Sequence, residues 1–448
     1  MAKVISSSLR DGLISHTFII KDDEVNKYLQ GCMIPADAKD VELNERLKHT
    51  IVYPASSMID HYITIDGATS TVQLKEGFPS SLLTFFQFGS LLIKQEDLDE
   101  IAGKPFVSPG DIKKLKEIER DKFVLPVKNV RMQGTMDFRN IVRKVIQDFF
   151  RKTNSGGSSM LDTLDWFIFR GYDPGGAPGV FVLNSCPHCR TSEIRLERDK
   201  MDLSRYSWSC TYEKCREEIY LTDVFRLFER VDEEAGAEAI VGHLRNVVES
   251  FLVVHAIKNI LRLRKEELER ILFVKEGPLS FGGDAHNMHR PMREMLNFLS
   301  KDHRINLVGV ETSGPFVEHA KEIRDKLAPG ELLLLDNAHI YKYIKAGNGH
   351  SQEYGRNNYY GGKMIYKSPD GRIYVLSMPV EDHLVYYNQP ELSDLRNPAE
   401  VLMSIDRLRC DVYENALIPV AVVNKLISLS NRPGVDLLEK FAKKSLQS

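Results

Sequence analysis

The chain lacks an excess of charge of either sign. Its 448 residues include 60 Lys and Arg and 63 Asp and Glu, which gives a formal net charge of −3. A protein with this balance has no global positive field of the kind that holds nucleic acid nonspecifically. Any contact with DNA therefore has to come from a local basic patch.

Long apolar runs are missing as well. No stretch approaches the roughly 18 to 20 apolar residues that span a bilayer, and the N-terminus lacks the apolar core of a signal peptide. Hydrophobic residues make up 42% of the chain and charged residues 27%. These values are ordinary for soluble globular proteins, and the length suffices for two or three domains. We expect a cytoplasmic protein with no membrane contact.

Cysteine is scarce and unevenly distributed. Of six cysteines, Cys32 and Cys410 stand alone, and the other four form the pattern C-x2-C, a gap of 20 residues, and C-x4-C. Residues 192–197 and 206–209 in the gap alternate like a β-hairpin that would bring the two pairs together. Four thiolates arranged in this way form a tetrahedral zinc site. The expected zinc ligands are Cys186, Cys189, Cys210 and Cys215.

Two other readings of this cluster are open. The four residues could be unrelated thiols, or His188 could replace a cysteine as a ligand. Disulfides are disfavoured because the cytoplasm is reducing. Four thiolates fill the coordination shell and leave no place for water or substrate, so the zinc would support the fold rather than catalysis.

Two acidic residues each precede a glycine at the end of a short β-pattern. Asp66-Gly67 follows residues 62–65, and Glu276-Gly277 follows residues 271–274. We expect both acids to stand at strand ends, where they could share Mg²⁺ or Mn²⁺. In phosphodiester cleavage, two such ions roughly 3.5–4 Å apart stabilise the attacking and the leaving oxygen. The alternative is that both dipeptides only mark turns.

Three segments resemble the NurA nuclease family and fall in the family's order. They are residues 66–70, 273–279 and 306–314, and residues 413–419 resemble the family's last block. The similarity spans roughly residues 55–90 and 240–435. It implies an α/β fold with an RNase H-like mixed sheet and flanking helices, into which the small zinc-ribbon module is inserted.

The expected domain organisation follows from this resemblance. Residues 1–165 form the N-terminal part of the NurA-like domain, residues 166–225 the zinc-ribbon insertion, and residues 226–448 the C-terminal part. Within the first part, residues 111–122 read as a charged helix and residues 138–152 as an amphipathic helix. Residues 154–159 read as a flexible linker.

The resemblance also implies a catalytic centre. Asp66, Glu249 and Glu276 would hold Mn²⁺ or Mg²⁺, and Tyr413 would steady the substrate. Its neighbours in the sequence leave two possibilities for Glu249. It is either a buried acid that needs a partner or a surface residue at the edge of the apolar stripe of its helix. Asp336 follows an apolar strand and is either a further ligand or a helix cap.

The chain departs from the family at two positions. Glu276 stands where the family has aspartate, and Ala421 stands where the family has histidine, eight residues after Tyr413. Candidates to replace that histidine are Asn424, His286 and His289.

Basic residues near these segments are candidates for DNA binding. Lys258 and Arg262 follow Glu249 on the same predicted helix, and Arg356 lies in an aromatic, glycine-bounded loop that suits single-stranded DNA. The alternative for each is an ordinary solvated surface.

Together these features predict a metal-dependent deoxyribonuclease that binds DNA. The resemblance further implies a homodimer that works with a HerA-like hexameric ATPase translocase in DNA end processing or in defence against foreign DNA. Two alternatives are a catalytically decayed NurA-like adaptor that binds the translocase, and a zinc-ribbon nucleic-acid-binding protein without chemistry.

Overall fold

The structure is a computed structural model. It describes residues 17–32, 34–75, 77, 79–102, 117–132, 134, 137–153, 157–345, 353–410, 416–429 and 432–447. Within them, a nine-stranded sheet has the order β1-β11-β12-β13-β10-β9-β2-β3-β4. Its strands are β1 Lys48–Thr50, β2 His61–Lys75, β3 Ser81–Lys94, β4 Glu117–Lys128, β9 Ile271–Glu276, β10 Asn306–Glu311, β11 Glu331–Leu334, β12 Gly361–Lys367 and β13 Ile373–Pro379.

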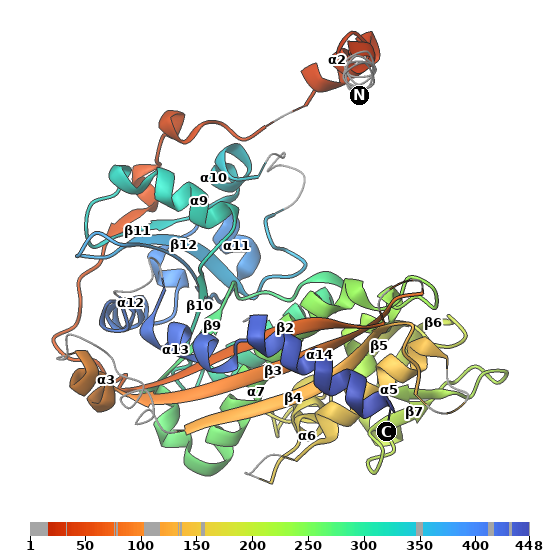
Figure 1. Ribbon diagram of the computed structural model, residues 1–448. Coiled ribbons are helices and arrows are strands. Elements are labelled where there is room, and N and C mark those ends of the chain that lie inside the picture. Colours follow the sequence, from red (N-terminus) through yellow and green to blue (C-terminus); the bar gives the residue numbers. More distant parts are fainter. Residues whose placement is uncertain are drawn as a thin grey trace.

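The sheet is mixed. β9 lies parallel to both β2 and β10, and the other neighbouring strands run antiparallel. Helices cover it, and Figure 1 shows α13 and α14 in front of β2 and β3, with α7 behind them. The predicted class, a mixed α/β sheet with flanking helices, is confirmed. The helices are α2 Asp23–Gln30, α3 Gln95–Ala102, α5 Phe138–Arg151, α6 Met160–Ile168, α7 Val241–Arg264, α8 His289–Leu299, α9 Pro315–Glu322, α10 Asn337–Tyr343, α11 His383–Asn388, α12 Pro398–Arg407, α13 Ile418–Ile427 and α14 Arg432–Gln447.

The two faces of the central strands belong to different cores. Ile65 and Phe273 pack in the cluster that contains the buried residues of α7, whereas Leu272 and Val274 pack in the cluster that contains those of α13. Successive side chains of a strand alternate between faces. In β2 and β9, odd-numbered residues therefore face α7 and even-numbered residues face α13.

The expectation that Asp66 ends a strand is wrong, whereas Glu276 is the last residue of β9. β2 continues through Asp66 and Gly67, with Asp66 opposite Gly89 of β3. Gly67 is needed for space rather than for a turn. A Cβ atom there would lie 2.8 Å from the Phe88 ring and 2.9 Å from Glu249 Oε1. Gly277, in contrast, has a φ of 81°, which suits the predicted turn after β9.

The predicted charged helix over residues 111–122 is wrong from residue 117 onward. Residues 117–128 form β4, the edge strand beside β3, and residues 103–116 lie outside the described residues. Charged side chains are common on edge strands because they oppose further pairing. The amphipathic helix is confirmed as α5, which buries Ile141, Phe149 and Phe150. In the predicted linker, Ser159 caps α6.

The cysteine segment forms two hairpins instead of the one predicted. β5 (Val180–Ser185) pairs with β6 (Ser192–Glu197), and β7 (Ser207–Ser209) pairs with β8 (Glu218–Tyr220). Each cysteine pair occupies the turn of one hairpin. The buried side chains Leu183, Trp208 and Ile219 belong to the same core as α5, α6 and α7, so the module packs closely against the sheet domain.

One helical region is long and apolar enough to cross a membrane by length and composition. It spans Glu238–Arg270 and includes α7, and 67% of its apolar window is buried inside the structure. Burial of this kind is expected of the central helix of a soluble protein.

Candidate active site

Asp66 and Glu276 lie side by side on the face of the sheet that α13 covers. Ile65 of β2 is the register partner of Lys275 of β9, so the next position in each parallel strand brings the two acids together. The Asp66 side chain is only 2% exposed. Its Oδ1 accepts a hydrogen bond of 2.7 Å from the Gly67 amide, and its buried Oδ2 has no hydrogen-bond partner.

The surroundings of Asp66 favour its neutral form. Burial, then the carboxylate of Glu276 and that of Glu249, raise the pKa of Asp66 to about 8. Two carboxylates at such close quarters do not both stay ionised unless a cation lies between them. Near neutral pH, the pair therefore holds either a proton or a metal ion.

Neutral donors hold Glu276 in place. The Thr312 hydroxyl donates to Oε1 over 3.0 Å, and Asn424 Nδ2 on α13 donates to Oε2 over 3.0 Å. Of the three candidates to replace the missing histidine, the structure thus brings Asn424 to the acids. His286 and His289 instead bond backbone carbonyls in the segment before α8 and at its start.

Glu249 approaches from the opposite face of the sheet. It is 4% exposed, and its carboxylate pairs with Lys275 Nζ at 3.7 Å and with Arg245 Nε at 3.4 Å. Burial raises the pKa of Glu249, and the two cations oppose that shift. Lys275 and Glu276 are consecutive in β9, so their side chains leave opposite faces. Glu249 approaches Gly67, next to Asp66, from the α7 face, whereas Asp66 and Glu276 lie on the α13 face.

The donor atoms around the pair suit a hard divalent cation. They are carboxylate oxygens, the Thr312 hydroxyl and, after rotation of its amide, the carbonyl oxygen of Asn424. Asp66 Oδ2 accepts no hydrogen bond from a donor group among the described residues, so it can serve as a ligand atom. The predicted set of three acids is nevertheless not assembled. Within the described ranges, the four cysteines are the only group of three or more His, Cys, Asp or Glu residues whose ligand atoms all lie within 4.8 Å.

Other predicted site residues lie in varied places. Tyr413 lies outside the described residues. Asp336 caps α10 by accepting a hydrogen bond of 2.7 Å from the His339 amide, which confirms the prediction of a helix cap. Arg356 is exposed and pairs with Glu353 at 3.2 Å.

Lys258 and Arg262 lie on α7, behind the sheet as seen from the acid pair. The ammonium of Lys258 donates to the Asp162 carbonyl over 2.7 Å, and burial lowers its pKa. Arg262 is exposed near the end of the helix. Their location favours a structural role for Lys258 and a solvent-facing one for Arg262.

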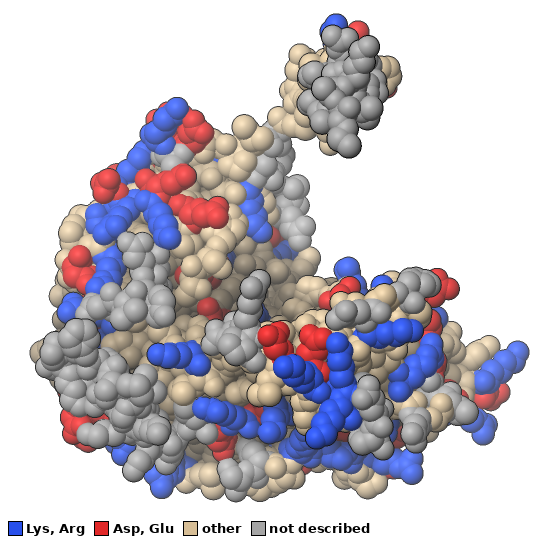
Figure 2. All heavy atoms as spheres, in the orientation of Figure 1, with Lys and Arg blue, Asp and Glu red and all other residues tan. Residues whose placement is uncertain are grey.

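Sequence reasoning missed a basic helix on the same face as the acid pair. α14 contacts β2, and its Lys440 and Lys444 are exposed. Figure 2 shows Lys and Arg side chains gathered over the C-terminal half of α14 and the elements beside it. The lysines at positions 440, 443 and 444 and the apolar residues between them were the available signal.

The four cysteines are placed to bind a metal such as zinc. The Sγ atoms of Cys186 and Cys215 are 4.0 Å apart, and those of Cys189 and Cys210 are 3.7 Å apart. Zn–S bonds of about 2.3 Å in a tetrahedron require sulfur separations of roughly 3.8 Å. These distances exclude the reading as four unrelated thiols.

Without metal, the thiols have different acidities. The hydroxyl of Thr191 lowers the pKa of Cys189 to about 6, and burial raises that of Cys210 to about 12. His188 is engaged elsewhere, since its Nε2 lies 2.8 Å from Arg143 Nη1 and 3.2 Å from the Glu218 carbonyl. The four cysteines can therefore hold a metal ion without it.

Comparisons with known proteins complete the description of the site. No family model and no curated protein matches the sequence. Similar solved structures include the NurA nuclease from Sulfolobus solfataricus, at 8% identity and a TM-score of 0.32, with 98% of this chain and 97% of that chain covered. A second structure of NurA has 10% identity and a TM-score of 0.26, with 96% and 94% covered. Similarity of this degree assigns neither a family nor an activity.

Proposed function

We propose that this protein is a metal-dependent DNA nuclease whose ion is held by Asp66 and Glu276. The observation that carries the proposal is the pair of neighbouring carboxylates, in which the buried Asp66 lies next to the half-buried Glu276 and has a raised pKa. Two neighbouring carboxylates bind a divalent cation well, because the cation offsets their repulsion and replaces the proton that the pair otherwise holds. Mn²⁺ or Mg²⁺ fits the oxygen donors best.

The bound ion would neutralise phosphate oxygens and activate water for hydrolysis of the phosphodiester. The protein's own side chains then have distinct tasks. Asp66 and Glu276 bind the cation, and Thr312 and Asn424 orient Glu276 through the hydrogen bonds described above. Asn424 thereby takes the place of the histidine that the chain lacks at residue 421.

Glu249 and Tyr413 have supporting roles in this proposal. Glu249 adds negative potential beneath Gly67 and strengthens cation binding at Asp66, consistent with its contribution to the raised pKa of Asp66. Tyr413 would contact the substrate, as the family resemblance implies. Lys440 and Lys444 on α14 would bind DNA phosphates next to the acids, together with more distant contributions from the exposed Arg262 and Arg356, whereas Lys258 would support the fold.

We further propose a cytoplasmic homodimer that acts with a HerA-like hexameric translocase, in DNA end processing or defence against foreign DNA. The formal net charge of −3 supports this partnership, because a motor that grips DNA would make a strongly basic nuclease unnecessary. The cysteine cluster would hold one structural Zn²⁺.

A second candidate function is a decayed adaptor that binds the translocase without cleaving DNA. The ion pair between Lys275 and Glu249 favours it, because a buried ammonium already neutralises the third acid. The two candidates differ in whether the pair binds a catalytic cation.

Calorimetric titration of the zinc-loaded protein with Mn²⁺ tests the proposed cation site. We expect one site outside the cysteine cluster, lost in Asp66→Asn and in Glu276→Gln and kept in the exposed control Asp199→Asn. Equal Mn²⁺ binding by wild type and Asp66→Asn would contradict the proposal.

A further inference from the structure

A cavity of about 440 Å³ lies at the other end of β10 from the acid pair. Asn306, the first residue of β10, lines it, whereas Thr312, which bonds Glu276, follows the last residue of that strand. Six residues of strand place the two sites roughly 20 Å apart. The cavity is therefore separate from the proposed nuclease centre.

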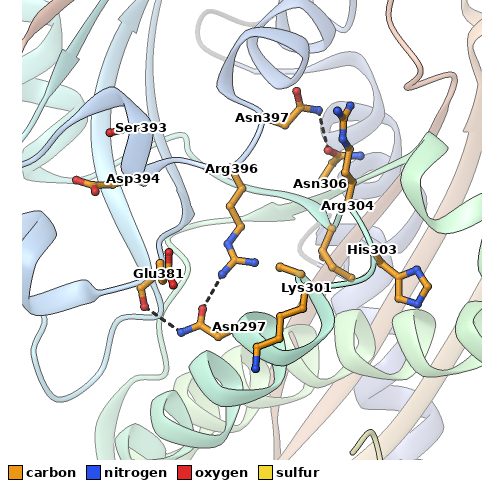
Figure 3. A pocket seen from close by; sticks show the side chains of 12 residues that line it. Asn297, Lys301, His303, Arg304, Asn306, Glu381, Ser393, Asp394, Arg396 and Asn397 are labelled. Atoms are coloured by element: carbon orange, nitrogen blue, oxygen red, sulfur yellow. Dashed lines mark hydrogen bonds between the residues drawn. The ribbon is translucent and has the colours of Figure 1, made fainter.

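Its walls come from three parts of the chain that converge at the start of β10 (Figure 3). They are the end of α8 with the turn into β10, residue 381 two positions after the end of β13, and residues 393–397 before α12. The volume lies in the range of pockets that bind small molecules. The basic lining residues are Lys301, His303, Arg304 and Arg396, and the acidic ones are Glu381 and Asp394.

Arg396 is held in a fixed position by neutral acceptors. Its Nη2 donates to Asn297 Oδ1 over 2.7 Å and its Nη1 to the Leu296 carbonyl over 3.2 Å. Asn297 is itself anchored, because its Nδ2 donates to the Glu381 carbonyl over 2.9 Å, as the dashed lines in Figure 3 show. A guanidinium has five N–H donors, and these two bonds leave others for a ligand.

In the part of the chain that the structure describes, Arg396 has no carboxylate within ion-pair distance, although the charge of Glu381 acts on it from farther away and partly opposes the lowering of its pKa by burial. Among the described residues, no carboxylate forms an ion pair with it, and the same is true of Lys301, whose ammonium lies 5.7 Å from the centre of the Phe298 ring. Arg304, in contrast, pairs with Glu400 at 3.3 Å. A partly buried cation without a directly bonded carboxylate favours an anionic ligand.

The cavity is also built before any ligand arrives. Asn397 donates to Asn306 Oδ1 over 3.0 Å, and Asn306 donates to the Glu269 carbonyl over 2.9 Å. These two bonds tie Asn397 and Glu269 to Asn306 and so fix the wall of the cavity at the start of β10. A preformed wall reduces the entropy that binding costs.

We propose that this cavity binds a small phosphomonoester that also carries hydroxyl or amino donors, as a sugar phosphate or a nucleoside monophosphate does. Arg396 binds two phosphate oxygens with its planar fork, and Lys301 adds a point charge. Glu381 and Asp394 on the opposite side accept hydrogen bonds from the hydroxyl or amino groups. The opposite charges of the two sides thus select a ligand with an anionic end and a donor end.

Calorimetry of the full chain with three probes tests this proposal. The probes are inorganic phosphate, ribose 5-phosphate and thymidine 5′-monophosphate, titrated in chloride buffer without divalent ions. We expect at least one organic phosphate to bind at least tenfold more tightly than inorganic phosphate, and the preferred organic probe distinguishes a sugar phosphate from a nucleotide. Arg396→Lys, which keeps the charge but loses the fork, and Lys301→Met should each weaken that binding at least tenfold.

The matched control is Lys321→Met, an exposed lysine on α9 outside the cavity. Its affinity should equal that of the wild type. Lys301 is exposed, so its substitution leaves the fold intact and keeps the test valid if Arg396→Lys is unstable. Equal affinities for inorganic and organic phosphate, absence of binding, or equal loss in Lys321→Met would each overturn the proposal, and none of them bears on the cation at Asp66.

Discussion

Lys275 Nζ lies 3.7 Å from Glu249 Oε2, and both side chains are almost completely buried. This pair lies on the α7 face of the sheet, while the neighbouring residue Glu276 turns to the α13 face and meets Asn424. Two adjacent positions of one strand therefore serve different purposes. One balances charge within the core, and the other forms the proposed cation site.

The first prediction concerns Glu249. Glu249→Gln should destabilise the protein by about 3–5 kcal/mol, because it leaves the ammonium of Lys275 buried without its partner. The double variant Glu249→Gln with Lys275→Met should recover most of that loss. Urea unfolding of the zinc-loaded protein measures both. A double variant no more stable than the single one would show that Lys275 does not depend on Glu249.

The second prediction concerns the space at Gly67. Gly67→Ala should cost about 1–3 kcal/mol and weaken Mn²⁺ binding, because its Cβ would displace the Phe88 ring and the Glu249 carboxylate. Gly242→Ala on α7 is the control, since nothing lies within 4 Å of its Cβ position. That substitution should stabilise the helix by about 0.5–1 kcal/mol. A Gly67→Ala protein as stable as the wild type would contradict the prediction, because the observed packing leaves no room for the added Cβ atom.

The third prediction concerns the cysteine cluster. The purified protein should contain one zinc ion per chain, and a chelator should lower its unfolding temperature, since structural zinc contributes on the order of 10 kcal/mol to a small module. Trp208 is 7% exposed and close to Cys210 in sequence, so its fluorescence should shift to longer wavelength on zinc loss. Cys186→Ser should bind no zinc, and the exposed Cys32→Ser should bind it normally. A zinc-free chain with unchanged fluorescence would refute the assignment.

The fourth prediction concerns pH. Burial, and then the charge of His319, lower the pKa of His339 to about 3. Below an unfolded pKa of about 6.5, the unfolded chain takes up a proton that the folded chain refuses, so the stability supplied by neutral His339 is lost as pH falls. Between pH 7 and pH 5, the wild type should lose about 2 kcal/mol relative to His339→Gln. Parallel stability curves for the two proteins would show that His339 protonates freely in the folded state.

Some features of the site could be predicted from the sequence because they are local. The segment around Glu276 is a short apolar run followed by Gly277, and the structure contains both the predicted strand and the turn after it. The cysteine spacing likewise defines its cluster, because ligand chemistry restricts the pattern to few arrangements.

Other features depend on contacts between distant residues. Gly67 resembles a turn glycine in sequence, but its role is set by Phe88 and Glu249, which lie far away in the chain. The hydrogen bond between Asn424 and Glu276 spans 148 residues. The face on which Glu249 lies became evident only from the packing of α7 against β2 and β9, which no local pattern encodes.

The most direct test of the proposed function is degradation of linear DNA by the purified full-length chain, alone and with a HerA-like translocase. We expect cleavage that requires Mn²⁺ or Mg²⁺, falls at least a hundredfold in Asp66→Asn and in Glu276→Gln, and is unchanged in the exposed control Asp199→Asn. Cleavage at the wild-type rate by folded Asp66→Asn protein would contradict the proposed function, because the carboxylate pair would then have no part in the chemistry.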